Sequence, residues 1–182
     1  MIDSKQASEA LADIDDIVQR VRQSELYELA SLAAMWWGVL VFAGNLITWL
    51  WPFYAGYAWV AVDVLGVGGL VGMRMVSPPR RHAVFDVRIL LVFLLFFAFG
   101  TLCTNVLGHF GPRQLGAFWP IYFMLFYTMA GLWFGHAFIA IGLGITALTL
   151  IGYFYIGEAF PLWMAFVNGG GLMLGGLWMR RS

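Results

Sequence analysis

Charged residues are scarce in this chain. Lys, Arg, Asp and Glu make up 11% of its 182 residues, whereas hydrophobic residues make up 62%. A soluble domain of ordinary composition has about a quarter of its residues charged. So few charges cannot cover a folded surface in water, which argues against a soluble protein. We therefore predict an integral membrane protein whose main partner is the lipid bilayer.

Cysteine and histidine are also scarce, and this limits redox and metal chemistry. Cys103 is the single cysteine and falls in an apolar run, so it cannot form an intrachain disulfide or act in a dithiol pair. His109 and His136 fall at opposite ends of predicted spans, so they cannot jointly hold a haem iron or a metal ion. We therefore predict neither a metal nor a cofactor.

Enzyme motifs are missing as well. The chain contains no P-loop or dinucleotide fingerprint in a suitable context. None of its serines lies deep in an apolar run, where an intramembrane nucleophile would be needed. A basic surface interleaved with aromatic residues is also lacking, so no nucleic-acid partner is expected. We predict that the protein is not an enzyme.

The N-terminal region, residues 1–27, is hydrophilic. Seven of the ten acidic residues fall in the first 28 positions, so this region is not a cleavable signal peptide. Leu11, Ile14, Val18 and Val21 follow the spacing of one helix face. The pattern predicts an acidic amphipathic helix in the cytoplasm. It either lies against the membrane domain or docks a protein partner.

The remaining residues, 28–182, form the predicted membrane domain. Six apolar stretches each approach the roughly 20 residues needed to cross the hydrocarbon: 29–51, 57–76, 88–109, 117–135, 137–156 and 161–179. Short connections join them in sequential pairs. The predicted fold class is therefore all-α, with six transmembrane helices in three hairpins preceded by the amphipathic helix.

The basic residues predict the topology. With the N-terminus inside, only Arg113 of the ten Lys and Arg residues falls on the outer side. Cytoplasmic loops carry such an excess of basic residues. We therefore predict a multi-pass protein of the cytoplasmic (inner) membrane with both termini in the cytoplasm.

The first and last hairpins have residue types in common at equivalent positions, such as Gly38 with Gly142 and Trp59 with Trp163. This indicates a duplicated hairpin. Glycine pairs spaced four residues apart suggest close packing of helices, or else a smooth wall beside a ligand path. These pairs are Gly68 with Gly72, Gly131 with Gly135, and Gly171 with Gly175.

Polar residues inside the spans form the candidate site. Counting along each helix places six of them in one layer in the outer half of the membrane: Asp63, Asn45, Thr104, Asn105, Thr149 and Asn168. Hydrogen bonds between helices, including one from Asn45 to Asp63, would explain the layer structurally. A shared pathway would explain it functionally, and an ionisable group in a span usually marks function.

The sequence is compatible with two functions. The first is a small transport or channel protein that moves a proton, a cation or a small polar solute through this layer. We expect a homo-oligomer, because six glycine-rich helices make a thin bundle with exposed packing faces. The alternative is a non-transporting accessory or sensor protein that docks a partner through its N-terminal helix.

Overall fold

The computed structural model describes residues 4–76 and 87–181, and every regular element in these ranges is helical. This confirms the all-α fold class. The α-helices are α1 (Ser4–Leu50), α2 (Ala55–Val76), α3 (Val87–Leu102), α4 (Pro112–Phe134), α5 (His136–Tyr155), α6 (Phe160–Met164) and α7 (Gly171–Arg181). A 3-10 turn, η1 (Pro52–Tyr54), and two π-helical turns, η2 (Cys103–Leu107) and η3 (Ala165–Gly170), complete the order.

Five helical segments are long and apolar enough to cross a membrane: Tyr27–Leu50, Pro52–Gly72, Pro112–Phe134, His136–Tyr155 and Phe160–Arg181. The protein is therefore a multi-pass membrane protein. The sixth expected span, 88–109, corresponds to a shorter apolar stretch, Leu94–Leu107, that runs from α3 into η2. The count of six stays a prediction.

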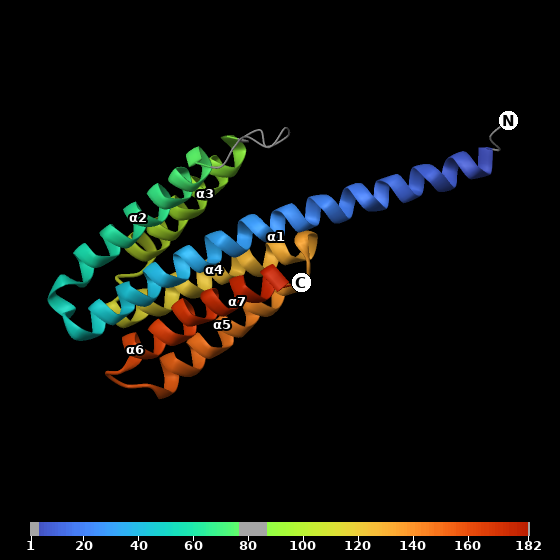
Figure 1. Ribbon diagram of the computed structural model, residues 1–182. Coiled ribbons are helices and arrows are strands. Elements are labelled where there is room, and N and C mark those ends of the chain that lie inside the picture. The colour runs from blue at the N-terminus through green and yellow to red at the C-terminus, as the bar shows by residue number, and fades with distance from the viewer. Residues whose placement is uncertain (1–3, 77–86, 182) are drawn as a thin grey trace.

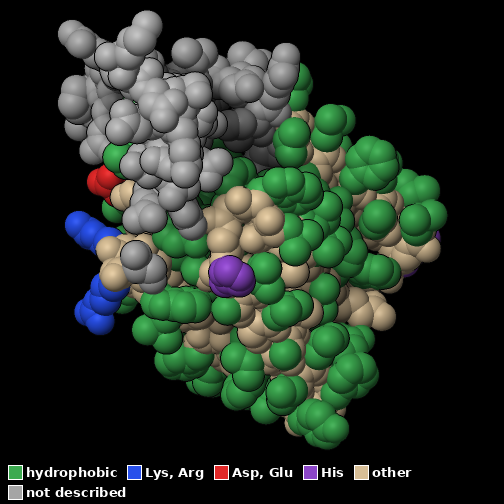
Figure 2. Space-filling model, turned by 90° about the vertical axis from the view of Figure 1, so that its right-hand side faces the viewer, with side chains coloured by type: hydrophobic (Ala, Val, Ile, Leu, Met, Phe, Trp, Pro, Cys, Tyr) green, Lys and Arg blue, Asp and Glu red, His purple; other side chains and the backbone are tan. Residues whose placement is uncertain are grey.

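The surface agrees with a lipid environment. Figure 2 views the molecule from the end at which α1 projects, and hydrophobic side chains cover most of the coloured surface. The Lys and Arg side chains in this view gather at one edge. Such large apolar surfaces are typical of proteins that face lipid rather than water.

Helix α1 is longer than the sequence predicted. It continues without a break through residues 27–29, where the change from polar to apolar residues suggested a boundary. The first proline of the chain is Pro52, and the residue before a proline is disfavoured in helical geometry, so α1 ends at Leu50. The 23 residues of α1 before Tyr27 would extend about 34 Å. Figure 1 shows this part projecting beyond the other helices.

Helix α1 packs along α7 and η3, so the first and last spans lie side by side (Figure 1). Glycines make this contact close. A Cβ atom on Gly169 would lie 2.7 Å from the backbone of Phe42, and one on Gly176 would lie 2.7 Å from the carbonyl oxygen of Ser31. Small residues are what lets helix backbones approach in this way.

Helices α4 and α5 form a tight hairpin. They meet at Gly135, whose φ of 130° is the one positive φ among the described residues. A Cβ atom on Gly131 would lie 2.7 Å from the backbone nitrogen of Ile139. Helix α5 also contacts α6, η3 and α7, so it packs on both of its neighbours in the chain.

Helix α3 packs on α4 through aromatic rings. The rings of Phe96 and Tyr122 are stacked with their centroids 3.9 Å apart, and those of Phe97 and Trp119 are 5.1 Å apart. The Tyr122 hydroxyl also donates a hydrogen bond to the carbonyl oxygen of Phe96, at 3.0 Å. Such stacking adds to the energy of area burial.

Helix α2 packs on α1 through one narrow face. Cβ atoms on Gly66 and Gly69 would overlap the indole rings of Trp37 and Trp36, respectively. The indole nitrogen Nε1 of Trp36 donates a hydrogen bond to the carbonyl oxygen of Leu65, at 3.2 Å.

The predicted packing glycines behave differently from one another. Gly131 faces Ile139, while Cβ atoms on Gly171 and Gly175 would lie 3.0 Å and 2.7 Å from side-chain atoms of Ile145 and Ile141. Added Cβ atoms on Gly68 and Gly72 would meet no atom within 4 Å. The first group thus packs within the chain, whereas the pair on α2 faces open space.

Arg113 has a structural partner that the sequence did not reveal. Its guanidinium group donates hydrogen bonds to the carbonyl oxygens of Tyr153, Ile156 and Gly157, at the end of α5. A cation at the C-terminus of a helix satisfies free carbonyl groups and favours the helix dipole. The one basic residue predicted on the outer side therefore ties the start of α4 to the end of α5.

Candidate functional site

The structure divides the predicted polar layer among three places. Asn45, Thr149 and Asn168 are buried inside the bundle. Thr104 and Asn105 lie in η2 beside an open pocket. Asp63 is exposed on α2. The six residues therefore do not share one site.

The buried group lies around the π turn η3. Gly169, Gly170 and Gly171 follow Asn168, and three consecutive glycines weaken α-helical geometry. A π turn holds one more residue than an α turn and frequently marks a functional site. Met164, Asn168 and Leu172 are all buried, so Asn168 lies on the side of this segment that faces the core.

Thr149 faces η3 from the neighbouring helix. Two contacts of α5 define its face toward the last span: Ile145 lies against Gly171, and Gly152 lies against Trp163. Thr149 falls between these two positions, four residues after the first and three before the second, and is therefore on the same helix face. Its side chain is fully buried, with 0% exposed.

Two buried oxygen atoms in this region lack a hydrogen-bond partner within the described part of the chain: Oγ1 of Thr149 and Oδ1 of Asn168. Thr48, Thr101 and Thr128 each donate to the carbonyl oxygen four residues earlier in their helices. The Thr149 hydroxyl makes no such bond. An unsatisfied buried polar group costs about 1–3 kcal/mol. Binding of a polar molecule beside either oxygen atom would therefore be favourable.

Asn45 lies on α1, close to the point where α1 contacts η3. Phe42, one turn before it, contacts Gly169 of η3. The Asn45 amide nitrogen donates a hydrogen bond to the carbonyl oxygen of Val41, at 2.9 Å. The amide is thus bonded to its own helix, and no bond from Asn45 to Asp63 is found among the described residues. These three neutral side chains offer donors and acceptors without charge.

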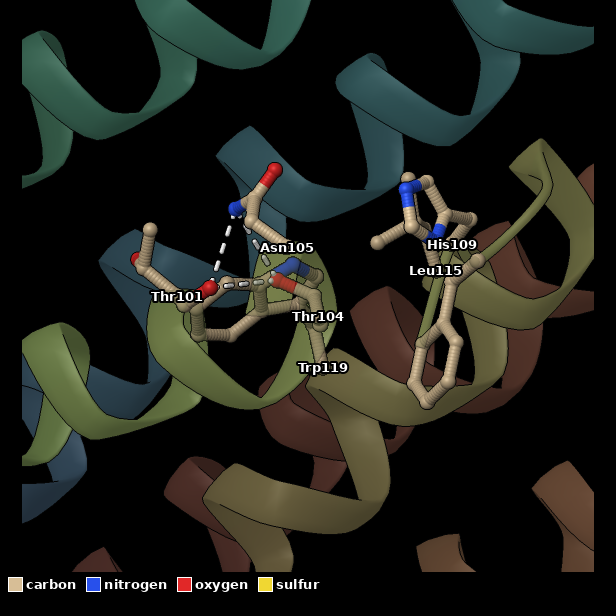
Figure 3. Close-up of a pocket in the computed structure, with 7 residues that line it drawn as sticks. Thr101, Thr104, Asn105, His109, Leu115 and Trp119 are labelled. Carbon is tan, nitrogen blue, oxygen red and sulfur yellow. Dashed lines mark hydrogen bonds between the residues drawn. The ribbon is translucent and has the colours of Figure 1, made fainter. Parts of the chain in front are cut away.

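The second polar group lines a pocket of about 460 Å³ at the end of α3 (Figure 3). Its walls are Thr101, Thr104, Asn105, His109, Phe110, Leu115 and Trp119. The Asn105 amide nitrogen donates to the carbonyl oxygen of Thr101, at 2.9 Å, while its oxygen points away from that carbonyl.

Sequence reasoning found Thr104 and Asn105 but did not group them with Thr101, His109 and Trp119. Thr101 and Asn105 are spaced four residues apart, which places side chains on one side of a helix, whereas His109 lies beyond η2 in the connection to α4. That spacing was the available signal. Trp119 comes from another helix and has no comparable signal in the sequence.

No group of three or more His, Cys, Asp or Glu side chains that could hold a metal ion occurs in residues 4–76 and 87–181. No family model, no curated protein and no solved structure matches the chain. The function must therefore be inferred from the residues of this chain alone.

Proposed function

We propose that this protein is a transport or channel protein of the cytoplasmic membrane, with both termini in the cytoplasm, that moves a small polar solute, a cation or a proton past η3. The observation that supports this is a pair of buried atoms, Thr149 Oγ1 and Asn168 Oδ1, that have no hydrogen-bond partner among the described residues. Polar groups in a span are satisfied internally because the hydrocarbon supplies no water. Unpartnered ones favour a polar guest.

The chemistry of the pair favours a neutral guest. The Thr149 hydroxyl can donate or accept a hydrogen bond, whereas Oδ1 of Asn168 only accepts. A molecule with an O–H or N–H group can bond to both. Water is the smallest such molecule, and a row of waters would also conduct protons. A bare cation would meet only neutral oxygens here, and this is a weaker match.

The glycines of η3 would allow its backbone to change conformation. Irregular backbone at membrane depth is tolerated where it is buried in protein or lines a cavity. Because Gly169–Gly171 have no side-chain constraint, η3 can exchange between π and α geometry at low cost. The exchange would move Asn168 relative to Thr149 and so open or close the passage between them.

The test is transport by purified protein in liposomes. The probes are water, glycerol, potassium ions and protons, each followed with the wild-type chain and with Thr149→Val. The substitution keeps the shape of the side chain and removes the hydroxyl. We expect at least one probe to cross faster than in protein-free liposomes, and Thr149→Val to slow it about tenfold.

Thr48→Val is the matched control. The Thr48 hydroxyl is bonded to its own helix, at 2.8 Å from the carbonyl oxygen of Gly44, so its loss should leave the flux unchanged. The proposal is wrong if no probe crosses faster than in protein-free liposomes, or if Thr149→Val conducts like the wild type.

A second candidate function has its own observation. The projecting part of α1 has exposed apolar side chains, Ile14, Ile17 and Val21, each more than half exposed. An exposed apolar stripe next to many acidic residues suits a protein partner better than anionic lipid. In this alternative the protein is an accessory or sensor that docks its partner through α1. Deletion of residues 4–23 would then abolish co-purification of one defined partner.

A further inference from the structure

Asp63 occupies an unusual position. It lies eleven residues after Pro52 and nine before Gly72, in the middle of the apolar span Pro52–Gly72. Its side chain is exposed, and no side chain among the described residues donates a hydrogen bond to it. Hydrocarbon cannot satisfy a carboxyl group, and ionisable residues in spans nearly always face protein or water. Something outside the described chain must therefore cover Asp63.

Asp63 belongs to an unpartnered face of α2. Val62, Gly66 and Gly69 point toward α1. Another set of residues, spaced 4-3-4-4, lies on the side turned away from α1, and we call this set the valine face: Gly56, Val60, Asp63, Val67 and Val71. All five are exposed. The span that contains them is the least buried of the five, with 11% buried against 50% for Phe160–Arg181.

We propose that the valine face is the contact between two copies of this chain, with Asp63 of one copy bonded to Asp63 of the other. Two copies inserted in the same orientation hold Asp63 at the same depth. A two-fold axis that passes beside the middle of the valine face places Asp63 opposite its own copy. In its protonated form a carboxyl group has both a donor and an acceptor, so it is complementary to its own copy.

The rest of the valine face suits the same contact. Apolar area does not drive helix association in lipid, so packing of short side chains and a polar bond decide it. Valine is stiff at χ1 and loses little freedom when it packs. A foreign helix would need a polar group at a matching depth, whereas a second copy supplies one automatically. The inference does not depend on transport by η3.

Cross-linking in liposomes tests the geometry. In a Cys103→Ala background, one cysteine is introduced either as Val67→Cys, on the valine face, or as Leu65→Cys. Leu65 is exposed like Val67 but lies on the opposite side of α2. Oxidation should link Val67→Cys into dimers and leave Leu65→Cys monomeric. Equal linking at both positions, or none at Val67→Cys, overturns the proposal.

Substitution of Asp63 tests the polar bond, with energy transfer between labelled copies as the measurement. Asp63→Leu should weaken association between about threefold and thirtyfold, which corresponds to one interhelical hydrogen bond. Asp63→Asn keeps a donor and an acceptor and should retain association. Asp63→Lys should not associate with itself but should associate with the wild type.

Each of these outcomes bears on the proposal. Asp63→Leu dimers as strong as the wild type would overturn it, as would a wild-type chain that is monomeric in lipid. Asp63→Lys that fails to bind the wild type would overturn it too, provided that the variant reaches the membrane folded. A foreign helix that binds the valine face while the wild type stays monomeric would replace the second copy as its partner.

Discussion

Arg113 lies with its guanidinium carbon 5.0 Å from the centre of the Phe160 ring, while the same group donates hydrogen bonds to the end of α5. Phe160 is the first residue of α6 and is almost fully buried. One side chain therefore joins three helices at one end of the bundle.

This arrangement predicts that Arg113→Met destabilises the protein by about 1–3 kcal/mol, because it leaves three carbonyl groups with fewer donors. Thermal unfolding in detergent, followed by circular dichroism, is the measurement. Arg113→Lys should recover only part of the loss, because an ammonium group cannot reproduce the planar fork of donors. If Arg113→Lys were as stable as the wild type, this would contradict the conclusion that the guanidinium group caps α5.

Gly169 and Gly170 offer a matched pair. A Cβ atom on Gly169 would lie 2.7 Å from the backbone of Phe42, whereas one on Gly170 would meet nothing within 4 Å. We expect Gly169→Ala to destabilise the protein by about 1–3 kcal/mol through overpacking. Gly170→Ala should be neutral or slightly stabilising, because alanine favours helix over glycine. Thermal unfolding of both variants decides the matter, and equal effects would refute the close α1–η3 contact.

We expect that removal of the Thr149 hydroxyl affects transport but does not lower stability. Because its hydroxyl has no partner among the described residues, Thr149→Val should leave the melting temperature unchanged or raise it. The same variant is expected to lose flux. Thermal unfolding and liposome flux must therefore be measured on one preparation. A clear fall in melting temperature would mean that the hydroxyl is bonded in the folded protein.

The projecting part of α1 is expected to contribute little to the thermal stability of the helix bundle. The core begins to include α1 at Tyr27 and Ala30, while Ile14, Ile17 and Val21 are exposed. Deletion of residues 4–23 should therefore shift the melting temperature by less than about 2 °C, as expected for residues far from the core. Differential scanning fluorimetry with the full chain as the reference is suitable. A large shift would show that this segment packs on the membrane domain.

Much of the fold could be predicted from hydropathy, because a 20-residue apolar run in a bilayer has few alternatives to a helix. The change in polarity near residue 27 predicted a boundary that α1 does not have, because such a change does not end a helix. Only Pro52 does so. The cap by Arg113 joins residues 40 to 44 positions apart, and no local pattern marks such a contact.

The depth of the candidate-site residues stays a prediction, and the direction in which each one faces could not be predicted from the sequence. Counting residues located Asp63, Thr149 and Asn168 along their helices. Which side each one faces depends on neighbours, and the packing of Trp36 and Trp37 against the glycines of α2 turns Asp63 outward. The missing back-bond of Thr149 depends on its rotamer, which sequence does not specify.

The unbroken course of α1 has a mechanical consequence. A single helix of 47 residues connects the projecting end to the position where Phe42 touches Gly169. Because a helix of this length is stiff, a displacement at one end is transmitted along it. A load that tilts its free end would therefore act on the backbone of η3, about 57 Å away.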